Sequence, residues 1–343
     1  GYDPNMSKND RPLVAITMGD PCGIGPEVVV KAMADPIVYS TCRPLVVGNV
    51  YAMEQAVALT GLPLKIKEVD ETTVAGTEPG VIEVVDIHNL NPEDITVGEI
   101  NPTCGQAAME WVTKAGELAL AGVVDGMATA PLNKEAASLA GYESIGHSEL
   151  LQELAGVKTV ATMLLAKNLR VVHLTTHRSL RLACDYVKKD RILEFLQLTH
   201  DNFVTWGFKN PRIGAAALNP HNSDGGLLGS EEAEEIAPAV EAARQRGIDV
   251  TGPVPADIIF HQAIQGRYDA VLCMFHDQGH IPVKVYGFEE SITANLGLPF
   301  VRTSVDHGTA FDIAGKGIAD AFSMLESIRL AVGLAKGNGL ADF

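Results

Sequence analysis

Three histidines each come just after a short apolar run of the chain. His177, His221 and His276 follow the runs 170–176, 212–218 and 270–274. Imidazole is a common ligand of Zn²⁺ and related divalent ions, and a catalytic metal site typically has three protein ligands and one open position. The pattern predicts one shared metal site. The alternative is three unrelated loop histidines, each hydrogen-bonded locally.

Two further places combine polar side chains with an apolar setting. Gly146-His147-Ser148-Glu149 is typical of a helix start, where either Ser148 caps the helix or His147 binds an anion. Lys284 and Arg302 are isolated cations in apolar stretches. A guanidinium holds phosphate or carboxylate through two parallel hydrogen bonds, so Arg302 is the better anion-binding candidate. The alternative is that their stems cover apolar surface while the charges reach water.

Two glycine-rich segments also suggest ligand contact. Residues 20–27, D-P-C-G-I-G-P-E, match neither the Walker nor the Rossmann phosphate motif. Pro26 suits a first helical turn and Glu27 the positive end of a helix, so a tight glycine turn and a ligand-cradling loop both remain open. In residues 305–320, small residues permit close backbone approach, and Asp312 would accept a hydrogen bond from a ribose hydroxyl. A structured loop with a helix cap is the alternative.

Short apolar runs alternate with amphipathic stretches along the chain. We interpret the apolar runs as strands and the amphipathic stretches as helices, which together would position these residues. The predicted strands are 13–17, 44–47, 81–85, 127–129, 160–165, 170–176, 212–218 and 270–274. The predicted helices are 106–121, 191–206, 231–246 and 319–335, and 91–104 is a predicted surface loop. This order predicts an α/β chain with a largely parallel sheet. The candidate residues lie at the carboxyl ends of the strands, where such sheets bind ligands.

Composition narrows the class of protein. A length of 343 residues predicts two α/β lobes rather than one core. The net charge of −17 argues against nucleic acid or an anionic membrane as a partner, and no apolar run reaches the ~18 residues of a membrane span. Five scattered cysteines without a C-x-x-C pair favour a soluble protein of the reducing cytoplasm. We expect no signal peptide, and residues 1–5 read as an expression remnant before Met6.

Several dispersed motifs resemble the 4-hydroxythreonine-4-phosphate dehydrogenase family over essentially the whole chain from Met6. These motifs are I-T-M-G-D-P-C-G-I-G-P-E from Ile16, A-T-A-P-L-N-K-E from Ala128, G-H-S-E from Gly146, T-T-H from Thr175, L-N-P-H from Leu218, H-D-Q-G from His276, and L-G-L-P-F-V-R-T-S-V-D-H-G-T-A from Leu296. The resemblance implies a two-lobed isocitrate/isopropylmalate dehydrogenase-like fold with an active-site cleft. It also implies a homodimer whose active site is shared between chains.

The same resemblance implies roles for individual residues. The first lobe, 6–135 with 286–343, would carry the nicotinamide loop, and the second, 136–285, the metal ligands and dimer contacts. One divalent ion (Zn, Mg, Mn, Co or Ni) would be bound by the three histidines above. The implied substrate contacts are His147, Ser148, Lys284, Thr293 and Arg302. The implied NAD contacts are His307, Gly308, Thr309, Ala310 and Asp312.

The implied reaction is NAD-dependent oxidative decarboxylation of a four-carbon phosphorylated hydroxy acid. A secondary hydroxyl held by the metal is oxidised to a ketone β to the carboxylate, and carbon dioxide then leaves. Arg302 and Lys284 would position the anionic ends of the substrate, and Asp277 would be a base or a neighbour supporting His276. A metal-dependent aldolase or phosphatase, or a binding-only family member, is the alternative.

Three departures bear on the substrate. Thr293 stands where the family usually has Asn, and Asn222-Ser223-Asp224 replaces the usual Ala-Gly-Glu beside a predicted metal ligand. H-D-Q-G-H-I-P-V-K and F-D-I-A-G-K-G resemble the branch that acts on D-threonate or D-erythronate 4-phosphate. Thr293 and the branch-like wording favour these 2-hydroxy acids over 4-hydroxythreonine 4-phosphate of pyridoxine biosynthesis. Asp224 favours the opposite order, because a carboxylate near the metal would attract the ammonium of the amino acid.

Overall fold

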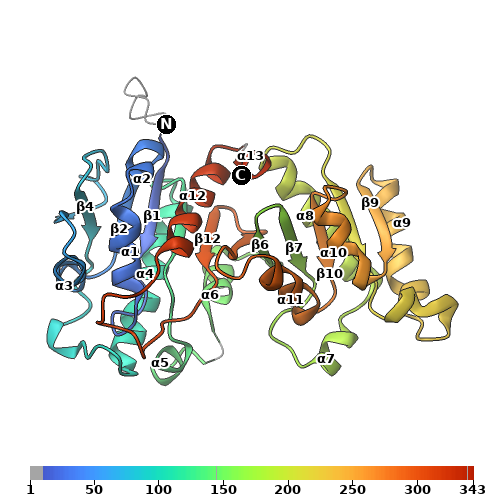
Figure 1. Ribbon diagram of the computed structural model, residues 1–343, viewed down its shortest axis with the longest axis horizontal. Coiled ribbons are helices and arrows are strands. Elements are labelled where there is room, and N and C mark those ends of the chain that lie inside the picture. Colours follow the sequence, from blue (N-terminus) through green and yellow to red (C-terminus); the bar gives the residue numbers. More distant parts are fainter. Residues whose placement is uncertain (1–10, 144, 338) are drawn as a thin grey trace. The chain divides into compact units, whose positions relative to one another are not determined.

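The computed structural model describes residues 11–143, 145–337 and 339–343, so the predicted expression remnant lies outside the described residues. The chain divides into two compact units (Figure 1). Unit 1 comprises Gly1–Lys158 and Leu298–Lys336, and unit 2 comprises Thr159–Gly297 and Gly337–Phe343. These bounds differ from the predicted lobes because helix 147–155 packs on helix 102–120 of unit 1 and strand 292–296 pairs with strand 161–166 of unit 2.

In the described part of unit 1 the strands are all parallel, in the order β3-β4-β2-β1-β5-β12. The strands are β1 (Leu13–Thr17), β2 (Arg43–Val47), β3 (Lys65–Val69), β4 (Val81–Val85), β5 (Gly126–Thr129) and β12 (Val301–Val305). The helices are α1 (Gly25–Met33), α2 (Pro36–Thr41), α3 (Val50–Thr60), η2 (Pro92–Asp94), α4 (Pro102–Leu120), α5 (Lys134–Leu139), α6 (His147–Ala155) and α12 (Phe322–Ala335). β1 is buried at every residue, as expected of a parallel strand covered on both faces.

In the described part of unit 2 the strand order is β11-β6-β7-β10-β8-β9. The strands are β6 (Ala161–Ala166), β7 (Leu169–His173), β8 (Arg212–Ala216), β9 (Asp249–Val254), β10 (Ala270–Cys273) and β11 (Ile292–Leu296). β6 is antiparallel to both β7 and β11, whereas the remaining pairs are parallel. The helices are α7 (Leu180–Asp185), α8 (Lys189–Thr205), η3 (Pro220–Gly226), η4 (Glu232–Ile236), α9 (Ala237–Gln245), α10 (Ala256–Ile264), α11 (His276–Tyr286) and α13 (Gly339–Asp342).

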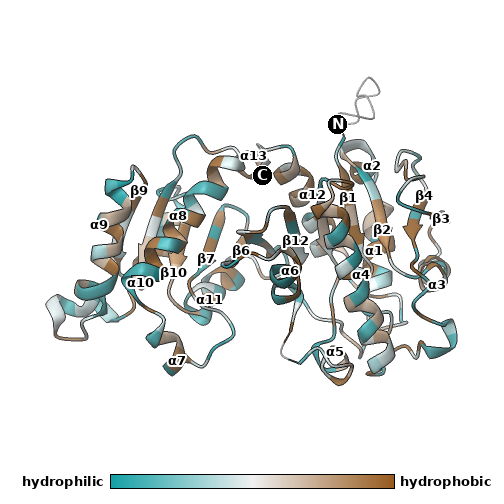
Figure 2. Cartoon of the chain, turned by 180° about the vertical axis from the view of Figure 1, so that it is seen from behind, coloured by the Kyte–Doolittle hydropathy of each residue, from teal (hydrophilic) through white to brown (hydrophobic). Residues whose placement is uncertain are grey.

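The predicted elements are present with shifted ends. β7 ends at His173 rather than at residue 176, and α12 begins at Phe322 rather than at residue 319. The predicted loop 91–104 overlaps the start of α4, where the Asn101 side chain accepts hydrogen bonds from the first-turn amides. Buried strands such as β1 carry mainly the hydrophobic colour in Figure 2, in line with their apolar sequences. In the described residues, no helix is both long and apolar enough to cross a membrane.

Candidate functional site

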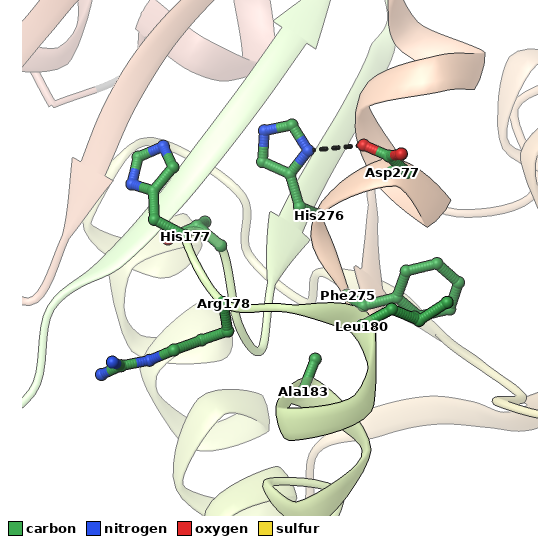
Figure 3. Close-up of a pocket in the computed structure, with 8 residues that line it drawn as sticks. His177, Arg178, Leu180, Ala183, Phe275, His276 and Asp277 are labelled. Atoms are coloured by element: carbon green, nitrogen blue, oxygen red, sulfur yellow. Dashed lines mark hydrogen bonds and ion pairs between the residues drawn. The ribbon is translucent and has the colours of Figure 1, made fainter.

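A pocket of about 360 Å³ in unit 2 brings two of the predicted metal ligands together (Figure 3). It is lined by Thr176, His177, Arg178, Leu180, Ala183, Phe275, His276 and Asp277. His177 follows β7, and His276 is the first residue of α11, which follows β10. Because β7 and β10 are parallel neighbours, their carboxyl ends place the two imidazole centroids 5.9 Å apart. The strand-end argument therefore accounts for this pair.

The His276 ring is oriented by its neighbour in the sequence. Its Nδ1 lies 2.8 Å from Oδ1 of Asp277, an acceptor that places the ring proton on Nδ1 and the lone pair on Nε2. A carboxylate that supports the non-ligating nitrogen is the usual partner of a metal-bound histidine. The donor set of this pocket thus fits a divalent ion. The contact also favours a positioning role for Asp277 over that of a base.

His221 lies in η3, where the backbone is unusual. His221, Asn222, Ser223 and Asp224 have φ of 52°, 53°, 63° and 48°, a run in the left-handed region. The three predicted histidines do not form a group whose ligand atoms all lie within 4.8 Å of one another. A single metal bound by all three therefore stays a prediction.

A surface group meets that distance instead: among the residues with assigned positions it is Glu68, Asp86 and His88. Asp86 already accepts hydrogen bonds from the amides of Val50 and His88, and His88 pairs with Glu68. These contacts explain the cluster as a structural link between the β4 end and α3.

Two histidines outside the predicted set adjoin His276. His280, one helical turn later, stacks on His276 with ring centroids 3.7 Å apart. Its Nδ1 lies 3.0 Å from Nε2 of buried His173, whose Nδ1 donates to the carbonyl of Thr162. Burial lowers the pKa of His173 to about 3, so this ring is neutral. The H-D-Q-G-H spacing is the sequence signal for this stack, because residues four apart share a helix face.

Unit 1 contains a separate cationic cluster around Arg302. This residue lies in β12 and is 5% exposed, and its Nη2 donates to Oγ1 of Thr129 on β5 at 2.9 Å. Burial lowers the pKa of its guanidinium to about 9, with Glu149 acting in the opposite direction. A buried cation of this kind is stabilised when an anion binds beside it.

His147, the first residue of α6, belongs to the same cluster. Burial and then the charges of Arg302 and Lys134 hold the pKa of His147 well below its usual range, so the imidazole is neutral near pH 7. Its buried Nε2 has no hydrogen-bond partner among the residues that the structure describes. Lys134, at the start of α5, was not predicted as a site residue; its signal was its place within the A-T-A-P-L-N-K-E motif that follows β5.

The capping interpretation of Ser148 is wrong. Gly146 is the N-cap of α6, and its N–H donates to Oε2 of Glu149 at 3.1 Å. Ser148 lies instead in the first turn of the helix. Glycine suffices as the cap because the Glu149 side chain supplies the acceptor that a capping box requires.

The other two predicted substrate contacts lie in unit 2. Lys284 is in the last turn of α11, with Nζ 5.3 Å from the centroid of the Phe288 ring. Thr293 is in β11, opposite Leu164 of β6. The predicted substrate residues are thus divided between the two units, with His147, Ser148 and Arg302 in unit 1.

The predicted NAD contacts lie between β12 and α12, where the backbone forms turns without a helix or strand. His307 has a buried Nε2 with no hydrogen-bond partner within the described part of the chain, and a Cβ added at Gly308 would meet nothing within 4 Å. Asp312 is exposed. An orphaned donor or acceptor beside open backbone fits a polar ligand such as a nucleotide.

Asp20, directly after Gly19 in the first glycine-rich segment, is a buried carboxyl group. It is 0% exposed, its Oδ1 accepts from the amide of Cys22, and its Oδ2 has no hydrogen-bond partner among the described residues. Burial is the main cause that raises its pKa to about 6. The folded chain therefore holds the Asp20 proton more tightly than the unfolded chain does. The stability that this protonation contributes is fully present below the ordinary pKa of 3.8 and is lost as the pH rises through about 6.

We accordingly expect Asp20→Asn to stabilise the chain at pH 8, by on the order of 3 kcal/mol, because the amide keeps the acceptor for Cys22 without a buried charge. The measurement is Tm from thermal denaturation at several pH values. The gain in Tm should shrink as the pH falls through about 6. A gain of equal size at pH 5 and pH 8 would show that the charge of Asp20 is not its cause.

Comparison with known proteins places the chain in a family. Residues 40–331 match the family described as pyridoxal phosphate biosynthetic protein PdxA. D-threonate 4-phosphate dehydrogenase of Cupriavidus necator is 46% identical over 325 residues, which cover 94% of this chain and 97% of that protein. 4-Hydroxythreonine-4-phosphate dehydrogenase of Geobacter metallireducens is 45% identical over 331 residues, with coverages of 96% and 98%.

A solved structure supports the same family assignment. The crystal structure of 4-hydroxythreonine-4-phosphate dehydrogenase from Klebsiella pneumoniae has a TM-score of 0.86 at 42% identity, covering 94% of this chain and 99% of that chain. The predicted fold class, α/β of the isocitrate/isopropylmalate dehydrogenase-like type, is confirmed. Because the match extends over nearly the whole chain in both sequence and structure, the chain belongs to the PdxA family of dehydrogenases.

Proposed function

We propose that this chain catalyses the NAD-dependent and divalent-metal-dependent oxidative decarboxylation of a four-carbon phosphorylated hydroxy acid. The observation that carries the proposal is the buried Arg302 cluster in a chain of a dehydrogenase family. A guanidinium with burial-lowered pKa next to a neutral imidazole and Lys134 is suited to an anion. Four-carbon acid phosphates carry two such groups, a phosphate and a carboxylate.

In this proposal the residues of the chain bind and orient the substrate. Arg302 and Lys284 hold its anionic ends, and His147, Ser148 and Thr293 contact its polar groups. Neutral His147 donates or accepts a single hydrogen bond rather than contributing charge. Such positioning brings the oxidisable C–H and hydroxyl into one reactive geometry.

The metal would be held by His177, His221 and His276, with Asp277 orienting the last of these. A bound divalent ion supplies a Lewis acid for the oxygen atoms of the hydroxyl and the ketone. The pocket between the ends of β7 and β10 supports the proposal through its two adjacent imidazoles. The proposal includes Zn, Mg, Mn, Co and Ni; imidazole ligands suit Zn and Ni, whereas Mg and Mn prefer oxygen ligands.

NAD would be bound by residues 307–312 and would accept the hydride. We expect NAD rather than NADP because a carboxylate at Asp312 accepts a hydrogen bond from a ribose 2′-hydroxyl and repels a 2′-phosphate. The open backbone at Gly308 and the buried Nε2 of His307 support a ligand at this segment. Since Asp312 is exposed, water would screen part of the repulsion between its carboxylate and a 2′-phosphate.

The proposal includes a homodimer with an active site shared between subunits. Its support is an exposed apolar stripe on and just after α11, where Ile281, Val285 and Phe288 are 58%, 83% and 72% exposed. The spacing of four residues places Ile281 and Val285 on one helical face, and Phe288 follows two residues after the helix ends. An apolar face beside the His276 pocket is suited to a second copy of the chain. A reducing cytoplasm fits the five free cysteines.

The deciding experiment is a panel of D-threonate 4-phosphate, D-erythronate 4-phosphate and 4-hydroxythreonine 4-phosphate, each with NAD and with NADP. We expect reduced nicotinamide to appear with NAD and at least one acid, with release of carbon dioxide. We also expect kcat/KM to favour a 2-hydroxy acid over the amino acid, because Thr293 offers no amide. A tenfold preference corresponds to only ~1.4 kcal/mol.

The outcomes distinguish the proposed dehydrogenase from an aldolase, a phosphatase and a binding-only protein. A preference for the amino acid phosphate would overturn the substrate order and leave the dehydrogenase assignment standing. Comparable kcat/KM with NAD and NADP would overturn the role of Asp312. Consumption of substrate without nicotinamide reduction would instead indicate an aldolase or phosphatase, and binding without turnover a binding-only protein.

A further inference from the structure

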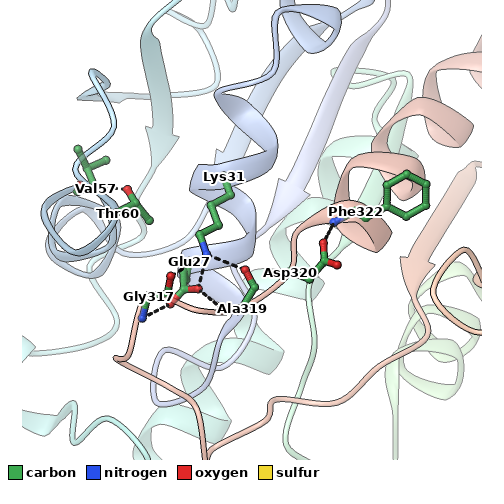
Figure 4. A network of polar contacts seen from close by, with 8 residues as sticks. All are labelled: Glu27, Lys31, Val57, Thr60, Gly317, Ala319, Asp320 and Phe322. Carbon is green, nitrogen blue, oxygen red and sulfur yellow. Dashed lines mark hydrogen bonds and ion pairs between the residues drawn. The ribbon is translucent and has the colours of Figure 1, made fainter.

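Glu27, in the first turn of α1, binds a distant backbone segment with its buried carboxylate. The residue is 3% exposed. Oε1 accepts a hydrogen bond from the amide of Gly317 at 3.1 Å, and Oε2 accepts one from the amide of Ala319 at 2.7 Å (Figure 4). Hydrogen bonds to a carboxylate are stronger than those between neutral groups, and the helix N-terminus favours the negative charge. One side chain therefore holds two amides nearly 300 residues further along the chain.

Lys31, one turn later on α1, completes the contact from the same face. Its Nζ lies 2.9 Å from Oε2 of Glu27 and donates to the carbonyls of Gly317 and Ala319 at 3.1 and 2.6 Å. The amides and carbonyls of the same two residues are thus bound by a carboxylate and an ammonium, respectively. This pattern exceeds what a surface ion pair requires, because each charge is directed at backbone as well as at the other charge.

The same N-terminal segment also contacts the start of the distant one. The amide of Ile24 donates to the carbonyl of Thr309 at 2.9 Å. A Cβ added at Gly23 would lie 2.7 Å from both Cβ and O of Thr309, so glycine is required for this approach. Residues 309–319 are consequently held at both ends by residues 23–31. This geometry favours a backbone support over the ligand-cradling alternative for the D-P-C-G-I-G-P-E segment.

We propose that Glu27 and Lys31 are positioning residues for the cofactor, holding residues 309–319 in the conformation that binds NAD. The inference rests on the proposed function, since it takes residues 307–312 as the NAD contacts. Because the segment between β12 and α12 has no helix or strand, its conformation depends on such side-chain contacts. A segment held before binding loses less conformational entropy when the ligand binds, which increases affinity.

The test compares wild type with Glu27→Gln and Lys31→Met. In Glu27→Gln, one acceptor becomes an NH₂ group facing a backbone N–H, and Lys31 loses its counter-charge. We expect faster amide hydrogen exchange at Gly317 and Ala319 in the chain without NAD. By isothermal titration we expect the Kd for NAD to rise about tenfold, or ~1.4 kcal/mol, while kcat at saturating NAD changes little. Lys31→Met should act in the same direction and serves if Glu27→Gln does not fold.

Glu71→Gln is the matched control, since it removes a surface ion pair with Lys114 elsewhere in unit 1. It should leave both hydrogen exchange and the Kd for NAD unchanged. Unchanged exchange in both test variants, or faster exchange with an unchanged Kd for NAD, would overturn the inference while wild-type turnover upholds the proposed function. A wild-type chain that binds no NAD would overturn the proposed function, and the inference with it.

Discussion

Replacing His276 by alanine is expected to lower kcat roughly a thousandfold, equivalent to ~4 kcal/mol of transition-state stabilisation, together with loss of bound metal. The change removes the Nε2 lone pair that Asp277 orients toward ligand binding. Turnover with the preferred acid and NAD gives the rate, and elemental analysis gives the metal content. His177→Ala and His221→Ala should behave alike if the three residues bind one ion.

The matched control is His261→Ala, which removes an exposed imidazole from α10 in the same unit. It should retain metal and turnover. Full metal occupancy in all three ligand variants would refute the site. A shared site also predicts that mixing His177→Ala with His276→Ala subunits restores partial activity in heterodimers. If verified subunit exchange brings no recovery, the sharing of the site between chains is refuted.

Arg302→Met is the other substitution with a large expected effect, a loss of roughly a hundred- to a thousandfold in kcat/KM for the phosphorylated acid, or ~3–4 kcal/mol. The buried guanidinium is the centre of the anion-binding cluster, and a truncated side chain leaves the bound anion without its partner. Arg302→Lys should restore little, because an ammonium cannot form two parallel hydrogen bonds in that geometry. Steady-state kinetics with varied acid at saturating NAD provide the measurement.

A second readout separates lost charge from general damage. Arg302 is one of the causes that lower the pKa of His147, after burial. In Arg302→Met the pKa of His147, followed by NMR, should therefore rise but stay below its ordinary range. Arg329→Met, which breaks a partly exposed ion pair on α12, is the control and should alter neither quantity. Wild-type kcat/KM in Arg302→Met would remove this residue from the substrate site.

The sequence was sufficient for the parts of the fold that rest on local patterns. Buried parallel strands such as β1 and β4 read as apolar runs, and Pro26 and Glu27 lie in the first turn of α1 as predicted. β3, K-I-K-E-V, escaped prediction because its residues are mostly exposed and charged. β11, I-T-A-N-L, and β12, V-R-T-S-V, also escaped prediction because polar side chains interrupt their apolar residues. The unit boundaries depend on pairing between distant segments, which local patterns do not encode.

In the candidate site, too, local patterns predicted some residues, whereas contacts between distant segments were missed. Strand-end reasoning brought His177 and His276 together, because parallel neighbours end at one edge. It did not find His173, which is the last residue of β7 and is buried against His280 and His276. The hydrogen bonds that Glu27 accepts from the amides of Gly317 and Ala319 could not be predicted, since a glutamate at a helix start is already explained by the helix alone.

Unit 1 is built from two segments of the chain that are separated by most of unit 2, so its sheet cannot be completed until late in synthesis. β5 ends at Thr129, yet its neighbour β12, with Val301 opposite Gly126, is synthesised only after all the strands of unit 2. Until then one edge of β5 exposes unpaired amides and carbonyls, a surface that favours association between chains. Pairing with β12 closes that edge, and the same strand brings Arg302 within hydrogen-bond distance of Thr129. The anion-binding cluster and protection from aggregation therefore arise in the same late event of biosynthesis.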